Sequence, residues 1–174
     1  LLKLKNGKIH FSITGDVLFK IIRKNSIIED GICYKKYILE DEEQIDIIST
    51  KNTIYGYLSV NGGFDLEKVW NSYSTNTKAN IGSNNGKKYS LQDKIFIKNS
   101  DLQIIKEMKI NYKHAPDNII RVIKGTNFDY FSSEAKNIFF KQEFLVTKLA
   151  DRMGVRLSGH KLENTISTNI KSEG

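Results

Sequence analysis

KIHFSITGDVLFKII, residues 8–22, holds the pattern that decides the fold class. Two runs of β-branched and aromatic residues flank TGD, a turn signal at residues 14–16. Similar runs follow, with EDG (29–31) and the acidic run EDEEQ as turn signals between them: KYIL (36–39), IDIIST (45–50) and TIYGYLSV (53–60). Five short strands at this spacing predict an all-β barrel or sandwich rather than alternating strands and helices.

A long polar segment, NGGFDLEKVWNSYSTNTKANIGSNNGKK at residues 61–88, follows these strand runs. It is rich in Gly, Asn and Ser, and irregular segments of this length in compact domains tend to be functional. Strand character returns in KKYSLQDKIFI (87–97), where SLQD is a turn signal. Gly56, inside the last strand run, suggests a bulge or a close backbone approach.

The second half of the chain begins after a polar stretch. Residues 99–118 contain the only proline, Pro116, and we expect an inter-domain crossing there. A first domain then spans residues 1–115 and a second spans residues 116–174.

The second domain combines expected strands with one helix. IIRVIKG (119–125) and EFLVTKL (143–149) have strand composition. Between them, Ser132 can cap a short helix. Its apolar stripe would consist of Ala135, Ile138 and Phe139.

Composition and charge exclude several classes of protein. With 39% hydrophobic and 27% charged residues, the chain is an ordinary globular one, and no apolar run of about eighteen residues predicts a membrane span. The net charge of +7 raises nucleic acid as a partner. However, the lysines are scattered and no aromatic–basic signature is present, so we expect a solvated lysine surface and no nucleic-acid partner.

Cysteine and histidine usage bears on compartment and metal binding. The single cysteine, Cys33, rules out an internal disulfide and favours a reducing cytoplasm. The three histidines and this cysteine show no ligand spacing, so we expect no metal site.

Two clusters in the polar segment could bind a ligand. YLSVNGGFD (57–65) places Tyr57 on a strand that runs into Gly62 and Gly63, and paired glycines let a ligand approach the backbone or form an ordinary turn. In SYST (72–75), Ser74 and Thr75 could donate to a phosphate or carboxylate, or could bond their own backbone. No histidine is placed to activate Ser74 as a nucleophile.

The third cluster is ADRMGVRLSG, residues 150–159, which holds two of the four arginines of a chain with twenty-three lysines. A guanidinium forks bidentately onto a carboxylate or phosphate, as lysine cannot. If 155–158 is a strand, Arg156 and Ser158 project to one face, opposite Val155 and Leu157. Arg152 and Arg156, with Asp151, therefore form an anion clamp or a structural Arg–Asp bridge, and side-chain chemistry alone leaves both open.

Together these motifs resemble one family. GYLSVNGGFD, NSYST and ADRMGVRLSG are similar, in order, to the patterns Y-L-A-V-x-G-G, G-S-R-S-T and S-D-R-M-G-Y-R-L-x-G of the carboxyltransferase subdomain A and B family, also called allophanate hydrolase subunit 2. The resemblance covers about residues 10–174. It departs at Asn71, Tyr73 and Val155, and replacing the arginine of G-S-R-S-T by Tyr73 removes a permanent cation.

The resemblance implies a mainly β fold of two packed cyclophilin-like β-barrels with one or two short helices. The first barrel would occupy residues 1–115 and lack its N-terminal part, and the second would begin at residue 116 and lack its C-terminal part. Family members extend beyond both ends of this chain, so we expect it to be a fragment.

The resemblance also implies a function. Members include the C subunit of the ATP-dependent 5-oxoprolinase, the carboxyltransferase part of urea amidolyase and an antagonist of a sporulation kinase inhibitor. We expect a cytoplasmic component of a 5-oxoprolinase-type amidohydrolase that uses ATP. Its partners would be a kinase-inhibitor-like protein, similar to the B subunit of that enzyme, and a lactam hydrolase similar to its A subunit. The alternatives are biotin-dependent carboxyl transfer to urea or a related amide, and a non-catalytic module that antagonises a kinase inhibitor.

Specific residues are expected to act in the complex. Arg152 and Arg156 would orient a carboxylate or phosphate, and Asp151 would hold the two arginines in position. These three residues would form the catalytic group. The ligand-binding group would be Tyr57, Gly62, Gly63, Ser74 and Thr75.

Overall fold

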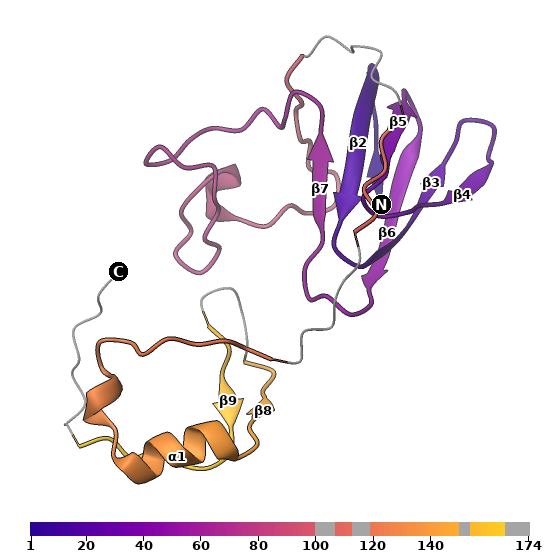
Figure 1. Cartoon of the computed structure of the whole chain (residues 1–174). Coiled ribbons are helices and arrows are strands. Elements are labelled where there is room, and N and C mark those ends of the chain that lie inside the picture. Colours follow the sequence, from indigo (N-terminus) through magenta and orange to yellow (C-terminus); the bar gives the residue numbers. More distant parts are fainter. Residues whose placement is uncertain (100–106, 113–118, 150–153, 166–174) are drawn as a thin grey trace. The chain divides into compact units, whose positions relative to one another are not determined.

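The computed structural model describes residues 1–99, 107–112, 119–149 and 154–165. The chain divides into two compact units, Leu1–His114 and Ala115–Gly174, which are described separately below (Figure 1). Of the expected crossing at residues 99–118, residues 99 and 107–112 are described, and Pro116 lies outside the described residues.

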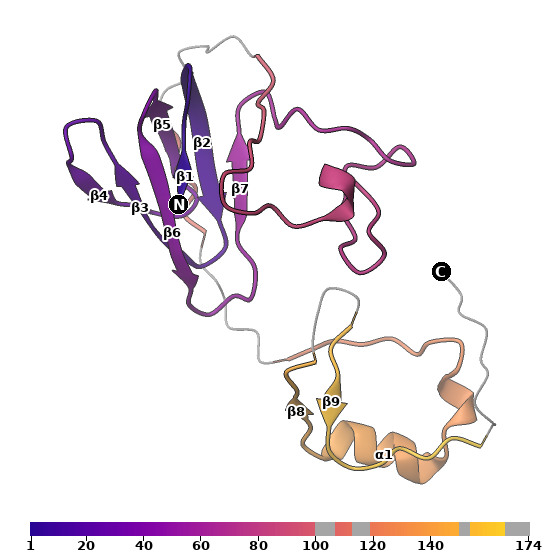
Figure 2. The same ribbon diagram turned by 180° about the vertical axis from the view of Figure 1, so that it is seen from behind.

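Unit 1 contains two antiparallel sheets. One has the strand order β1-β6-β3-β4 and the other the order β5-β2-β7 (Figures 1 and 2). The strands are β1 (Leu2–Lys3), β2 (Lys8–Thr14), β3 (Val17–Ile22), β4 (Ile28–Asp30), β5 (Lys36–Glu40), β6 (Gln44–Thr50) and β7 (Tyr57–Val60). Consecutive strands β2 and β3 thus belong to different sheets, and the turn at Gly15 carries the chain from one sheet to the other.

Both sheets contribute to one hydrophobic core. In β2 and β3 every second residue is buried, as expected for strands with one face on a core: Phe11, Ile13, Val17, Phe19 and Ile21. Leu39 from β5 and Ile45 from β6 complete the cluster. The Tyr37 ring stacks on Phe11 with a 5.6 Å centroid distance and meets Phe19 edge-on at 6.0 Å, so aromatic contacts link the two sheets.

The segment 107–112 returns to unit 1 beside the start of β5. The backbone N–H of Lys36 donates to Met108 O at 2.9 Å, and that of Ile110 donates to Tyr34 O at 2.9 Å. The rings of Tyr34 and Tyr112 stack with their centroids 4.8 Å apart. These contacts place chain that follows the polar segment against the strand-rich part of the unit.

Several strand predictions are confirmed, and others are wrong. The runs 8–14 and 17–22 are strands with the expected bounds, whereas TIYGYLSV is a strand only over Tyr57–Val60. Gly56 precedes that strand and allows a close approach, because a Cβ there would lie 2.3 Å from a Val17 methyl carbon. EDG does not form a turn, since Glu29 and Asp30 pair with β3; the chain reverses instead at Ser26, where φ is 63°.

Unit 2 is small and mostly exposed. Helix α1 (Ser133–Lys141) begins as predicted, with the Ser132 hydroxyl accepting from the Ala135 N–H at 3.0 Å. Strands β8 (Leu145–Val146) and β9 (Leu157–Ser158) pair in a two-stranded sheet. The expected strand IIRVIKG is wrong, because residues 119–125 have no ladder partner among the described residues.

The mainly β fold class is confirmed, with one α-helix and the 3₁₀ turns Asn84–Gly86 and Phe128–Tyr130 in the described chain. Within that part of the chain the strands form open sheets rather than the expected closed barrels, because no ladder joins the two sheets of unit 1. The expected strand at 87–97 is also wrong, since only Ile97 makes a bridge, to Phe64.

Candidate functional site: the 61–98 loop

The polar segment forms one long loop, residues 61–98, that leaves the end of β7 on the side away from β3 and β4 (Figures 1 and 2). Its two ends are joined by backbone hydrogen bonds. The N–H of Lys98 donates to Gly63 O at 3.0 Å, and that of Asp65 donates to Phe96 O at 2.8 Å. The loop is therefore anchored on the β7 end of the three-stranded sheet.

Gly62 and Gly63 form the turn that opens this loop. Both have φ of +79°, a conformation that favours glycine, and the Gly63 N–H donates to Val60 O at 3.1 Å. A Cβ at Gly63 would meet nothing within 4 Å, so the space beside this backbone is open. The glycine pair thus forms a turn with open space beside it, while the N–H and the carbonyl of Gly63 are both hydrogen-bonded within the unit.

Hydroxyl groups hold the middle of the loop together. The buried Ser83 hydroxyl donates to Glu67 O at 2.8 Å, and the Thr75 hydroxyl donates to Ser83 O at 3.3 Å. Gly82 lies against the backbone of Ser74, where a Cβ would come within 2.4 Å of the carbonyl oxygen. Thr75 therefore has a structural hydrogen bond within the loop.

Two lysines from distant positions converge on Tyr73. The ammonium groups of Lys68 and Lys98 lie 5.0 Å and 5.6 Å from the centroid of its ring. Lys68 also contacts the Asn71 side-chain oxygen at 3.4 Å. The position at which the family pattern has an arginine is thus occupied by an aromatic ring flanked by two cations.

A tight turn precedes Tyr73. Val69 and Ser72 exchange backbone hydrogen bonds of 3.0 Å each, and the central residues Trp70 and Asn71 have φ of 50° and 60°. Two positive φ values are typical of a type I′ turn, where Asn is favoured and a bulky residue is strained. Trp70, the only tryptophan of the chain, is 82% exposed at this turn.

The other expected site residues lie elsewhere. Tyr57 is at the start of β7, the opposite end of that strand from Gly62, and its side chain is exposed. Arg156 is exposed in unit 2, just before β9, and its carbonyl accepts from the Thr147 N–H at 2.9 Å. Val155, Leu157 and Ser158 are exposed too, and the strand covers only the last two residues of 155–158. Asp151 and Arg152 lie outside the described residues.

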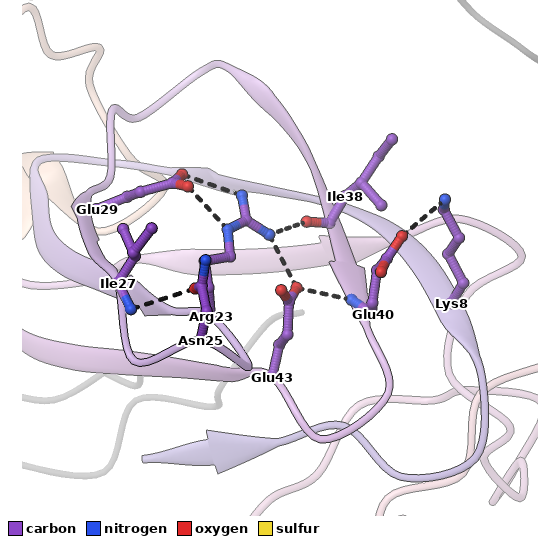
Figure 3. Close-up of polar contacts among 8 residues, drawn as sticks. All are labelled: Lys8, Arg23, Asn25, Ile27, Glu29, Ile38, Glu40 and Glu43. Atoms are coloured by element: carbon purple, nitrogen blue, oxygen red, sulfur yellow. Dashed lines mark hydrogen bonds and ion pairs between the residues drawn. The ribbon is translucent and has the colours of Figure 1, made fainter.

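A second polar cluster surrounds Arg23 in unit 1 (Figure 3). Its guanidinium donates to both Glu29 oxygens at 2.9 and 3.0 Å, to Glu43 at 2.9 Å and to the Ile38 carbonyl at 2.8 Å. Hydrogen bonds from Arg23 hold the pKa of Glu29 below its ordinary value. A surface depression of about 470 Å³ adjoins the cluster.

The Arg23 cluster is better explained as a structural clamp than as a ligand site. Its guanidinium bonds side chains and backbone from both sheets, which leaves it committed to Glu29, Glu43 and Ile38. Glu43, almost fully buried, also accepts from the Glu40 N–H at 2.9 Å. These bonds link the β3–β4 hairpin to β5.

The sequence did not single out Lys68 or Lys98. They are thirty positions apart in a chain with twenty-three lysines, and nothing in the local sequence separates them from solvated surface lysines. In the sequence, the feature that indicated a functional site in this region is the unusual length of the polar segment. Chemically, the loop offers ammonium groups that can bind an anionic ligand, and residues 61–98 contain no histidine to activate a nucleophile.

Comparisons with known proteins agree with the fold. The sequence profile of the carboxyltransferase domain, subdomain A and B, matches residues 6–174. The chain therefore belongs to this carboxyltransferase domain family. K. lactis urea amidolyase has a similar structure, with a TM-score of 0.68 and 20% identity over 92% of this chain and 10% of that one.

Two curated relatives are similar in sequence. The C subunit of 5-oxoprolinase from Haemophilus influenzae is 28% identical over 131 residues, which are 75% of this chain and 41% of the relative. Urea amidolyase of Saccharomyces cerevisiae is 30% identical over 118 residues, 60% of this chain and 6% of the relative. The chain thus spans less than half the length of either relative.

Two further findings concern the described residues only. No group of three or more histidine, cysteine or acidic side chains there could hold a metal ion. Nor does any helix in those ranges combine the length and apolar character of a membrane span.

Proposed function

We propose that the chain works as one subunit of an ATP-dependent 5-oxoprolinase-type amidohydrolase complex. The main support is the sequence similarity to the C subunit of 5-oxoprolinase from Haemophilus influenzae, which covers three quarters of this chain. The C subunit of 5-oxoprolinase from Escherichia coli is a second such relative, at 28% identity. Those relatives are named as subunits, which supports a function that depends on partner chains.

The reaction would convert 5-oxoproline, ATP and two molecules of water into glutamate, ADP and phosphate. ATP would activate the ring carbonyl, and water would then open the lactam. Both 5-oxoproline and ATP are anionic, so a subunit that binds either one needs cationic groups at its binding site. The 61–98 loop offers Lys68 and Lys98 at the Tyr73 ring, which supports ligand binding there.

Asp151, Arg152 and Arg156 remain the proposed catalytic group in unit 2. Arg152 and Arg156 would orient a carboxylate or phosphate through bidentate hydrogen bonds, which a lysine provides less well. If so, Arg152→Lys lowers the turnover of the complex although the charge is kept. An unchanged rate would remove Arg152 from this role.

The function is tested by reconstitution. The chain is combined with the two expected partners, the kinase-inhibitor-like protein and the lactam hydrolase, and glutamate release from 5-oxoproline is measured with and without ATP. We expect release that requires both ATP and this chain. A rate that does not change when the chain is omitted would contradict the proposal.

A second candidate is biotin-dependent carboxyl transfer to urea or a related amide. The 30% identity to Saccharomyces cerevisiae urea amidolyase favours it. It requires a biotinylated carrier as partner. Carboxylation of urea by the chain in the presence of a carboxybiotin carrier, without glutamate release from 5-oxoproline, would favour this reaction over the first.

A further inference from the structure

We propose that Lys68, Tyr73 and Lys98 bind a small oxyanion, a carboxylate or a phosphate, in the 61–98 loop. The proposal names a binding position within the proposed function, and it rests on that function only for the choice of 5-oxoproline as one of the probes. The remaining steps depend on the charges and contacts of the loop.

Lys68 and Lys98 concentrate positive charge at Tyr73. Both ammonium groups lie within 6 Å of one ring centroid, so they are at most about 11 Å apart. An ion midway between them is then at most about 5.5 Å from each ammonium group, which is within the Debye length of about 8 Å at physiological ionic strength, so both charges act on it. A flexible four-carbon stem lets each ammonium move toward such an ion.

No acidic side chain in the described part of the chain neutralises these two charges. No carboxylate among the described residues lies within ion-pair distance of either ammonium group, although Asp65 and Glu67 are in the same loop. The Tyr73 ring attracts cations through its quadrupole but carries no net charge. Within the described chain, two cations therefore remain available to an anion at this ring.

Hydrogen bonds within the loop hold the backbone around both lysines. Lys98 is fixed by its backbone bond to Gly63, and the segment after Lys68 is closed by the Val69–Ser72 turn. The hydroxyl bonds between Thr75, Ser83 and Glu67 connect the middle of the loop. The backbone at both lysines is thus held on a bonded framework, and the phenol hydroxyl of Tyr73 adds a donor to an oxyanion.

The test is an NMR titration of the isotope-labelled 174-residue chain with inorganic phosphate and, separately, with 5-oxoproline. We expect amide shifts at Tyr73 and its loop neighbours, with a dissociation constant on the order of 1 mM for at least one probe. Binding of phosphate alone points to a nucleotide phosphate as the physiological group. Binding of 5-oxoproline alone points to a substrate carboxylate, and both results support the site.

Matched variants locate the site. Lys68→Gln and Lys98→Gln should each weaken binding about three-fold, and the double variant about ten-fold, as for exposed charge interactions. Lys94→Gln removes an exposed lysine from the same loop and should leave binding unchanged. Equal binding by the double variant and Lys94→Gln, or shifts confined to other parts of the chain, would overturn the proposal.

Trp70 provides an independent measurement because it is the only tryptophan and is exposed three residues before Tyr73. Iodide, an anion, should quench its fluorescence more strongly than neutral acrylamide does, relative to free tryptophan. The double lysine variant should lower the iodide quenching constant about two-fold and leave acrylamide quenching unchanged. An iodide constant that does not respond to the two lysines would contradict the proposed charge concentration.

These results are separable from the fate of the proposed function. The binding measurements use the chain alone, whereas the enzymatic test needs the complex. Oxyanion binding without glutamate release would retain the site and remove the oxoprolinase function. Glutamate release without lysine-dependent binding would retain the oxoprolinase function and remove the oxyanion site.

Discussion

At Gly82, the backbone of the 61–98 loop passes too close to Ser74 for any side chain. Its φ is +117°, and a Cβ would lie 2.4 Å from the Ser74 carbonyl oxygen and 2.7 Å from the Thr75 Cα. Both neighbours are backbone atoms, which cannot move away without displacing the loop. Gly82 thus determines the path of the segment that carries Tyr73.

We predict that Gly82→Ala opens this loop. The strained φ alone costs of order 1–3 kcal/mol, and the backbone clash adds to it. Thermolysin should therefore cleave the loop of the variant several times faster than that of the unaltered chain. Gly125→Ala is the control, since a Cβ there meets nothing within 4 Å. Equal cleavage of both variants would contradict this account of Gly82.

Glu42 gives a prediction about pH. Hydrogen bonds from Lys3 and then Lys5 lower the pKa of its carboxyl to about 2. Because the folded-state pKa is below the unfolded value, the stabilisation is complete above about pH 4.5 and is lost as the pH falls toward 2. Above pH 5, the free energy of unfolding measured in urea should be lower for Glu42→Gln than for the unaltered chain. The two values should converge near pH 2. A difference that grows as the pH falls would contradict it.

For single residues, the sequence shows which residue types are present more clearly than it shows which residues they contact in the fold. It singled out Gly62, Gly63, Ser74 and Thr75 because their conformational freedom and hydroxyls are visible in the letters, and a role of these residues in binding stays a prediction. It missed Lys68 and Lys98 because their convergence on Tyr73 depends on a loop whose path is set by backbone contacts such as those of Gly82. Such contacts have no periodic pattern in the sequence.

Among the elements, β3 shows how alternation determines the core. Ile21 is fully buried, whereas Leu18 on the other face of the same strand is 38% exposed. We predict that Ile21→Ala lowers the free energy of unfolding by about 2–5 kcal/mol, as for fully buried aliphatic side chains. Leu18→Ala should cost clearly less. Chemical denaturation of the two variants compares them directly, and equal losses would contradict the assigned faces.

The strands that the sequence predicted over their full length are those with a buried face, whereas the expected strand EFLVTKL forms a ladder only at the exposed pair Leu145–Val146. In β2 and β3 a period-two pattern is imposed by the core, so composition and alternation agree. KKYSLQDKIFI and IIRVIKG also have strand-like composition. In the described chain, however, the first makes one isolated bridge, from Ile97 to Phe64, and the second makes none. β-Propensity reports fit to a pleated, half-buried surface, and without a partner strand it does not produce a ladder.

For the whole molecule, the two units differ in how much they bury. Among the described residues, seven buried hydrophobic side chains form the core of unit 1, whereas unit 2 has one, that of Ala135. Cooperative protection in proteins follows buried contacts. Unit 1 should therefore be the more stable of the two.

Amide hydrogen exchange measures this difference. We predict slow exchange in β2 and β3 and exchange at least about ten-fold faster in β8 and β9, because few buried contacts protect the latter. Residues 119–125 should exchange fastest among the described parts of unit 2. Equal protection of β3 and β8 would show that unit 2 has a core that these contacts do not reveal.

We propose above that the 61–98 loop is a ligand site of a 5-oxoprolinase-type complex. ATP-dependent glutamate release by the reconstituted complex tests it most directly, comparing the unaltered chain, the Lys68→Gln/Lys98→Gln double variant and Lys94→Gln. We predict that the double variant raises the KM for 5-oxoproline or for ATP about ten-fold, as expected for two lost charge contacts, while Lys94→Gln leaves both unchanged. Identical KM values for all three chains would contradict the claim.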